Sequence, residues 1–263
     1  MNTKLRLGLV IGVYISAMLF VAGLWLNSIR LQRIQQSGQL KIQILKPKPE
    51  NILIDNREIR ENVLKFLKKD LRKIKSHALN LHGLEAKLES LPVVHHAEVY
   101  LDANQNLHVD VYQRDPLVRI VEPHGNSYYL DAEGNTIPGS SRYSARVPVA
   151  TGIVGQAGKN PVLKGNQSEF KNIFYLAQEI ARDTFAQALI EQIDVQPSGD
   201  VVLIPKIGSE KILFGKVENV TEKLQKLHFF YQEGLRYEGW NVYQTIDLQN
   251  KDQVVCKRNI SQL

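Results

Sequence analysis

Three histidines in one short stretch are the first residues of this sequence whose type and spacing suggest chemistry. His95 and His96 are adjacent, and His108 follows further along the same stretch. Imidazole nitrogens are common zinc ligands. The neighbouring residues alternate between apolar and polar types, as in a β-strand, and adjacent strand residues point to opposite faces of a sheet. Because no cysteine or carboxylate at ligand spacing completes a set, we predict strand-edge histidines and no metal site.

Three further groups have the residue types of a phosphate loop, a carboxylate pair and a thiol nucleophile. The stretch GIVGQAGKN, residues 152–160, is off by one residue from a phosphate-binding loop, and Asn160 stands where magnesium coordination needs Ser or Thr. Asp131 and Glu133 stand at a glycine turn, so turn formation is the better interpretation. Cys256 lies in a terminal strand pattern without a basic partner on its own face. The sequence therefore predicts no catalytic residue, no cofactor and no enzyme.

The composition is that of a folded protein. Hydrophobic residues make up 43% and charged residues 23% of 263 residues, which suffices for one large domain or two ordinary ones. The net charge is +6, but Lys and Arg are mixed with Asp and Glu, and no basic tract with interleaved aromatic residues occurs. A nucleic-acid partner is therefore not expected. The single cysteine excludes an intrachain disulfide and leaves the redox compartment open.

An uncharged apolar run, LGLVIGVYISAMLFVAGLWL, occupies residues 7–26. A helix of this length spans about 30 Å, the thickness of the hydrocarbon core of a bilayer. The alternative is a cleaved signal peptide, but its apolar region is shorter and leads into a small-x-small cleavage site. Here Trp25 stands where an interfacial anchor is expected. We predict an uncleaved transmembrane helix, whose orientation the flanking charges leave open.

After a polar connector, the pattern predicts strand, helix, helix, strand and strand. Residues 39–46 alternate as a strand, and Asp55 with Glu58 forms a capping-box start for the first helix. A second helix with leucines at helical spacing ends at Pro92. Two alternating runs joined by the turn residues DANQN then form a hairpin. The predicted unit is α+β, with two helices on one face of a three-stranded sheet.

The remaining pattern, from Leu117, predicts a β-sheet backed by two amphipathic helices, within residues 166–183 and 216–235. The last strand, residues 253–257, is expected at an open sheet edge, which offers backbone groups to a partner strand. Lys257 and Arg258 would then select an acidic partner segment. Alternatively, these charges only protect the edge from aggregation. On the residues alone both interpretations remain open.

Taken in order, these elements resemble a POTRA domain followed by the β domain of the FtsQ/DivIB family of bacterial cell-division proteins. The resemblance rests on LEAKLESLPVVHHAEVYLDANQNLHVDVYQRDPLVRI, YYLDAEGNTIP, RVPVATG and TIDLQNKDQVVCKR, which cover nearly the whole chain in the family's order. A basic insertion between the two helices departs from a minimal POTRA domain. The implied organisation is a cytoplasmic tail (1–6), a transmembrane helix (7–26), a connector (27–38), a POTRA-like domain (39–116), a β domain (117–258) and a tail (259–263).

The resemblance also implies a function. The protein would be a non-enzymatic divisome scaffold that links early and late division proteins and helps control septal peptidoglycan synthesis. It would be a single-pass protein of the bacterial inner membrane at the septum, with its N-terminus in the cytoplasm and its bulk in the periplasm. Partners of the FtsB and FtsL type would add a strand at the C-terminal edge of the β domain. The implied partner-binding residues are Tyr243, Thr245, Asp252, Gln253, Val254, Val255, Cys256, Lys257 and Arg258, and Gln113, Arg114 and Pro116 mark the domain junction.

Two other functions are weighed against this one. A POTRA-containing transport or envelope-assembly factor predicts a long C-terminal array of amphipathic transmembrane strands, and the two predicted helices argue against it. A membrane-anchored cell-wall hydrolase needs a nucleophile and a base, and the sequence offers neither.

Overall fold

The computed structural model describes residues 14–25, 38–45, 51–68, 71–74, 78–123, 125–140, 142–152, 154, 168–239 and 242–259. The chain divides into two compact units. Among the described residues, the first unit contains the N-terminal part up to Leu45 together with Asp55–Tyr112. The second unit contains the chain from Gln113 onward and also residues 51–54.

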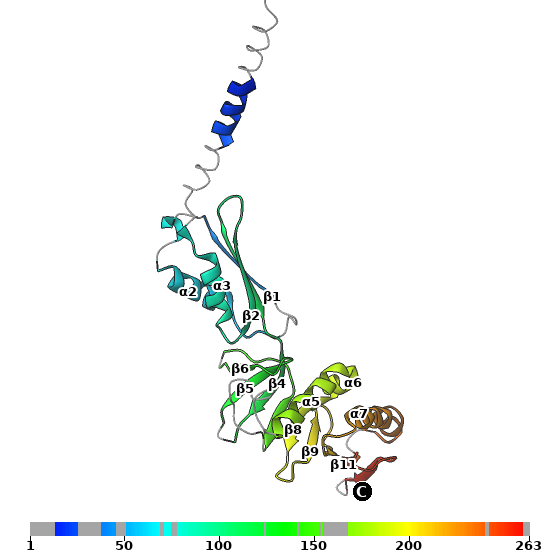
Figure 1. Cartoon of the computed structure of the whole chain (residues 1–263). Helices are drawn as coiled ribbons and strands as arrows, with labels where there is room; N and C mark the ends of the chain where they lie inside the picture. The colour runs from blue at the N-terminus through cyan, green and yellow to red at the C-terminus, as the bar shows by residue number, and fades with distance from the viewer. Residues whose placement is uncertain are drawn as a thin grey trace, which may run out of the picture. The chain divides into compact units, whose positions relative to one another are not determined.

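The first unit has the predicted order of strand, helix, helix, strand and strand. Its elements are β1 (Leu40–Leu45), α2 (Asn56–Leu67), the short 3₁₀ helix η1 (Leu71–Lys73), α3 (Leu81–Glu89), β2 (Val94–Leu101) and β3 (Leu107–Gln113). The three-stranded sheet has the order β1-β3-β2, with β1 parallel to β3. Figure 1 shows α2 and α3 side by side along this sheet. The predicted α+β arrangement is confirmed.

Local sequence signals fix where the two helices begin. The Asp55 carboxylate accepts a hydrogen bond from the Glu58 N–H at 2.8 Å, as the capping box predicts. Asn80 caps α3 in the same way, by accepting from the Gly83 N–H at 2.9 Å. Each helix then turns its apolar face to the sheet. The buried core of the unit includes Ile59, Val63, Leu84, Leu88, Val94, Ala97, Val99, Leu107, Val109 and Val111.

The second unit is built on a nine-stranded sheet within the described residues. The strand order is β12-β11-β10-β9-β8-β7-β4-β5-β6, and the pairs β4–β7, β7–β8 and β10–β11 are parallel. The strands are β4 (Pro116–Val121), β5 (Ser127–Asp131), β6 (Thr136–Pro138), β7 (Val149–Gly152), β8 (Ile190–Val195), β9 (Val201–Pro205), β10 (Lys211–Gly215), β11 (Tyr243–Asp247) and β12 (Val255–Arg258).

The helices of this unit include the two that the sequence predicts, α5 (Ser168–Arg182) and α7 (Val220–Phe229). The predicted second helix continues beyond α7 as the π-helical segment η3 (Phe230–Gly234), whereas two shorter segments were not predicted: α6 (Thr184–Leu189) and α8 (Leu235–Glu238). Neither α6 nor α8 is long enough to show a helical repeat of apolar residues. The helices α5, α6 and α7 contact one another and contribute to one apolar core with the sheet.

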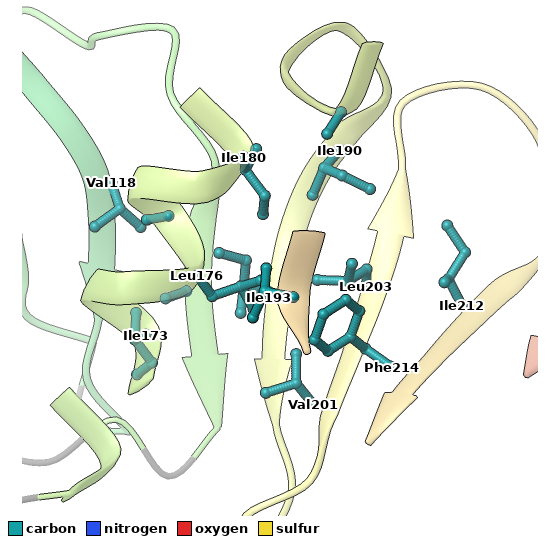
Figure 2. Packing of buried hydrophobic residues seen from close by; sticks show 14 of the residues in the cluster. Val118, Ile173, Leu176, Ile180, Ile190, Ile193, Val201, Leu203, Ile212 and Phe214 are labelled. Carbon is teal, nitrogen blue, oxygen red and sulfur yellow. The ribbon is translucent and has the colours of Figure 1, made fainter. Parts of the chain in front are cut away.

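Apolar side chains join the helices to the sheet in that core. Figure 2 shows Ile173, Leu176 and Ile180 of α5 beside Val118 and Ile193 of the strands, and all five are at most 1% exposed. Ile190, Val201, Leu203, Ile212 and Phe214 extend the same layer toward the C-terminal strands. Burying a side chain of this size contributes about 1.5–3 kcal/mol. The core therefore packs α5 and α7 against the sheet as far as the C-terminal strand β11.

The predicted transmembrane run is described only over residues 14–25, which are helical. The large apolar side chains there are exposed, including Tyr14, Met18 and Trp25. In the part of the chain that the structure describes, no helix combines the length and the apolarity needed to cross a bilayer. The rest of the run, the N-terminal residues 1–6 and most of the predicted connector lie outside the described residues, as does most of the 152–160 stretch.

Candidate partner-binding site

The histidines of the first unit pair with separate carboxylates. Nδ1 of His96 lies 2.6 Å from Oε1 of Glu89, and Nε2 of His108 lies 3.1 Å from Oδ2 of Asp102. His95 is exposed on β2. Within the described residues, no three His, Cys, Asp or Glu side chains are grouped to hold a metal ion. His96 is thus paired with a carboxylate at the end of α3, and His108 with a carboxylate of the β2–β3 turn.

Asp131 is a turn-forming carboxylate that is only 1% exposed. Its Oδ1 accepts hydrogen bonds from the N–H groups of Glu133 and Asn135, at 3.0 and 2.7 Å. Its Oδ2 lies 2.8 Å from Nη1 of Arg114. The Glu133 carboxylate is exposed and lies 3.4 Å from the same Arg114 nitrogen. Both oxygens of Asp131 and Oε2 of Glu133 are therefore engaged at a turn and its cation, which agrees with the turn interpretation.

The predicted junction residues make ordered contacts within the second unit. The buried Gln113 amide donates to the Asn51 carbonyl and accepts from the Leu53 N–H, both at 2.8 Å. The Asn51 side chain in turn accepts from the Arg146 N–H at 2.9 Å. Gln113 therefore binds the backbone of residues 51–53 as a neighbouring strand would. Pro116 begins β4.

The predicted partner-binding residues gather at one end of the nine-stranded sheet. Among the described strands, β12 is terminal and pairs only with β11, to which it is antiparallel. The register places Tyr243 opposite Arg258, and Thr245 opposite Lys257. The strand itself runs over Val255–Arg258, not over the predicted residues 253–257. Asp252, Gln253 and Val254 thus form the approach to β12 and are not part of the strand.

The two faces of β12 differ. Cys256 is opposite Ile246 and lies partly buried against the core of the unit. Val255 is 46% exposed, and Lys257 is also exposed. Because successive residues of a strand alternate between faces, Val255 and Lys257 share the face opposite to Cys256. That face of the strand therefore offers one aliphatic and one cationic side chain to the surroundings, and Arg258 is also exposed.

A groove of about 610 Å³ lies beside the approach to β12. Helix α7 and η3 form its other wall. Its lining consists of Glu222, Gln225, Lys226, Phe229, Phe230, Glu233, Gly234, Asp252, Gln253 and Val254. The helix residues in this set are not among those predicted from the sequence. One signal marks them: Phe229 falls off the apolar stripe of Val220, Leu224 and Leu227, and it is 68% exposed.

Aromatic contacts and a buried polar pair hold the helical wall. The Tyr231 hydroxyl donates to the Glu210 carboxylate at 2.6 Å, and both residues are buried. Burial and this carboxylate raise the pKa of Tyr231. The Phe230 ring lies 5.6 Å from the ring of Tyr243 on β11. These contacts fix η3 against the terminal strands, and so they position the aromatic part of the groove.

Two lysines of α7 donate hydrogen bonds to backbone carbonyls, one at the end of β10 and the other in the turn between β11 and β12. Lys223, which is 6% exposed, donates from Nζ to the carbonyls of Phe214 and Lys216, at 2.9 and 2.8 Å. Burial lowers the pKa of the Lys223 ammonium group. Lys226 donates to the carbonyls of Asn250 and Lys251, at 2.7 and 2.9 Å. Lys226 thereby attaches the β11–β12 turn to the helix.

Replacing Lys226 with methionine is expected to loosen the β11–β12 turn while leaving the core folded. The variant keeps most of the aliphatic stem but loses charged donors to two carbonyls, which contribute about 1.5–3 kcal/mol each when buried and less at this half-exposed site. Amide hydrogen exchange across residues 249–254 should accelerate by roughly tenfold, which corresponds to about 1.4 kcal/mol. Lys251→Met, at an exposed position of the same turn, is the control. Equal exchange in both variants would contradict the assignment.

Comparison with known proteins identifies the family to which this chain belongs. The family model described as FtsQ/DivIB, C-terminal related, matches residues 115–257, which is more than half of the chain. The matched part includes the nine-stranded sheet and both walls of the groove. The chain is also similar to the cell division protein FtsQ of Rhodothermus marinus, with 28% identity over 259 residues, which cover 95% of this chain and 85% of that protein. The chain therefore belongs to the FtsQ/DivIB family.

Proposed function

We propose that this protein is a non-enzymatic scaffold of bacterial cell division, which links early and late division proteins and helps control septal peptidoglycan synthesis. Family membership and the similarity to the cell division protein FtsQ of Rhodothermus marinus support a role in division. The observation that carries the proposal is the terminal position of β12 beside an apolar groove, in the part of the chain that the family model matches. This arrangement suits the binding of a protein segment rather than the turnover of a substrate.

The partners are bitopic division proteins of the FtsB and FtsL type, and a segment of one of them adds a strand along β12. Strand addition supplies backbone hydrogen bonds, while alternate side chains provide specificity. On one face the added side chains lie next to Val255 and Lys257. On the other face they lie toward Cys256 and the groove. Lys257 and Arg258, both exposed, attract acidic residues of the partner.

The protein is held in the bacterial inner membrane by the apolar run of residues 7–26, with its N-terminus in the cytoplasm and its bulk in the periplasm. The uncharged sequence and the exposed apolar side chains of helical residues 14–25 support this anchor. The POTRA-like first unit contacts other members of the divisome at the septum. Gln113, Arg114 and Pro116 form the junction between the two domains.

The proposal is tested by depleting the protein in its native cell. Loss of a division scaffold should give long filaments without septa, and a fluorescent fusion should return to midcell as septation recovers. A reporter fused to the C-terminus should be active only in the periplasm. Normal division after depletion, or a cytosolic C-terminal reporter, would contradict the proposal. So would turnover of a cell-wall precursor by the purified periplasmic part.

A further inference from the structure

We propose that the groove beside β12 receives a long basic side chain, lysine or arginine, from the bound partner segment. This inference rests on the proposed function, because it assumes that a partner segment lies along β12. It adds the chemical identity of the residue at one end of that segment. The aromatic floor, the acidic rim and the position of the groove along the strand each support it.

The apolar part of the groove lining, here called its floor, consists of Phe229, Phe230 and Val254. Phe229 is 68% exposed. The faces of aromatic rings carry partial negative charge and attract ammonium and guanidinium groups. The aliphatic stems of lysine and arginine also bury well against such a surface. A volume of about 610 Å³ is that of a pocket for a small ligand, so it accommodates a side chain of this length.

The rim of the groove is acidic. Glu222, Glu233 and Asp252 are all exposed there, and in the described part of the chain no ion pair neutralises these carboxylates. The one lysine in the lining, Lys226, directs its ammonium group to the carbonyls of the β11–β12 turn. Its donors are therefore occupied. The groove presents a net negative rim around an aromatic floor, which is complementary to a basic side chain with a long apolar stem.

Charge changes sign along the proposed binding path. The rim carboxylate of Asp252 precedes β12, whereas Lys257 and Arg258 stand at the far end of the strand. A partner strand on this path therefore meets negative charge at one end and positive charge at the other. We infer a partner segment with acidic residues opposite Lys257 and Arg258 and a basic residue at the end near the groove. If this partner segment ran in the opposite direction, its basic residue would lie near Lys257 and Arg258 and its acidic residues near the acidic rim, so like charges would meet.

The first test uses the purified periplasmic part of the native FtsB-type partner as probe and full-length protein in detergent. The variant Glu222→Gln/Glu233→Gln/Asp252→Asn removes the rim charge with little change of shape. We expect affinity to fall by at least tenfold at low salt, and the difference from wild type to shrink at 1 M salt, where the screening length is about 3 Å. The control variant Glu61→Gln/Glu98→Gln/Glu191→Gln removes three exposed charges elsewhere and should bind as wild type does.

The second test separates a basic occupant from an apolar one. Phe229→Tyr keeps an aromatic face, whereas Phe229→Leu keeps an apolar side chain without one. A basic side chain in the groove predicts wild-type affinity for Phe229→Tyr and severalfold weaker binding for Phe229→Leu. Equal affinity of these two variants, or unchanged or tighter binding by the rim variant, overturns the inference alone. If the wild-type protein does not bind the partner, the proposed function and the inference both fall.

Discussion

Replacing Val255 with proline is expected to abolish partner binding while the body of the second unit stays folded. The Asn259 N–H donates to the Val242 carbonyl at 2.8 Å, across from β11. Because the direction of N–H groups alternates along a strand, those of Lys257 and Val255 point to the same side. Val255 is opposite Asp247 in the ladder. Proline at 255 therefore removes a hydrogen bond to β11 and detaches the strand on which the partner is proposed to bind.

The cost to the rest of the unit should be small, since β12 contributes exposed side chains and only Cys256 and the preceding Val254 lie partly buried against the core. We expect partner affinity to fall on the order of 100-fold, which corresponds to about 2.8 kcal/mol, with little change in the main unfolding transition. Isothermal titration with the partner and differential scanning calorimetry measure the two effects. Val255→Thr keeps both the N–H and the β-branched shape, and it should bind nearly as wild type does. Strong binding by the proline variant would show that β12 is not the docking strand.

Much of the fold can be predicted from local sequence patterns. The alternation of residues 39–46, the capping box at Asp55 and the stop at Pro92 each act over a few residues, and the structure has the corresponding elements. The amphipathic repeats of α5 and α7 are long enough to be distinctive. The parallel pairings are different. Partners such as β10 and β11 are joined across an intervening helix, so no local signal gives their register.

The candidate site likewise has one side that local sequence patterns predict and one side that they do not. Its strand side was predicted from the alternating pattern of the last strand, and among the described strands β12 lies at the sheet edge. Its helix side does not, because the groove depends on where α7 continues into a π-helical turn at Phe230–Gly234. That turn is held by the Glu210–Tyr231 pair, whose members are far apart in the sequence. The local signal that could have indicated it is Phe229, which lies off the apolar stripe of α7 and is 68% exposed in the structure.

The second large effect is expected at Arg114, whose guanidinium faces a carboxylate that is almost completely buried. Replacing Arg114 with methionine removes the cation 2.8 Å from Asp131 and leaves that buried charge with the hydrogen bonds of the turn but without its cation. Removing one member of a buried pair costs about 3–5 kcal/mol, and the partial exposure of Arg114 places this case near the lower limit. For a unit of this size, the melting temperature should fall by roughly 6–12 °C. Arg236→Met, at an exposed helical position, should change it little.

A double variant separates the effect of the buried Asp131 charge from the effect of the hydrogen bonds that form the turn. In Arg114→Met/Asp131→Asn, the side-chain oxygen of the asparagine can still accept from the N–H groups of Glu133 and Asn135, but no unpaired charge remains buried. The double variant should therefore be more stable than Arg114→Met alone, by about 1–2 kcal/mol in chemical denaturation. Arg114→Met within about 0.5 kcal/mol of wild type would mean that the turn hydrogen bonds alone hold the Asp131 charge. In that case the ion pair with Asp131 would not explain why Arg114 stands with Gln113 and Pro116 at the predicted domain junction.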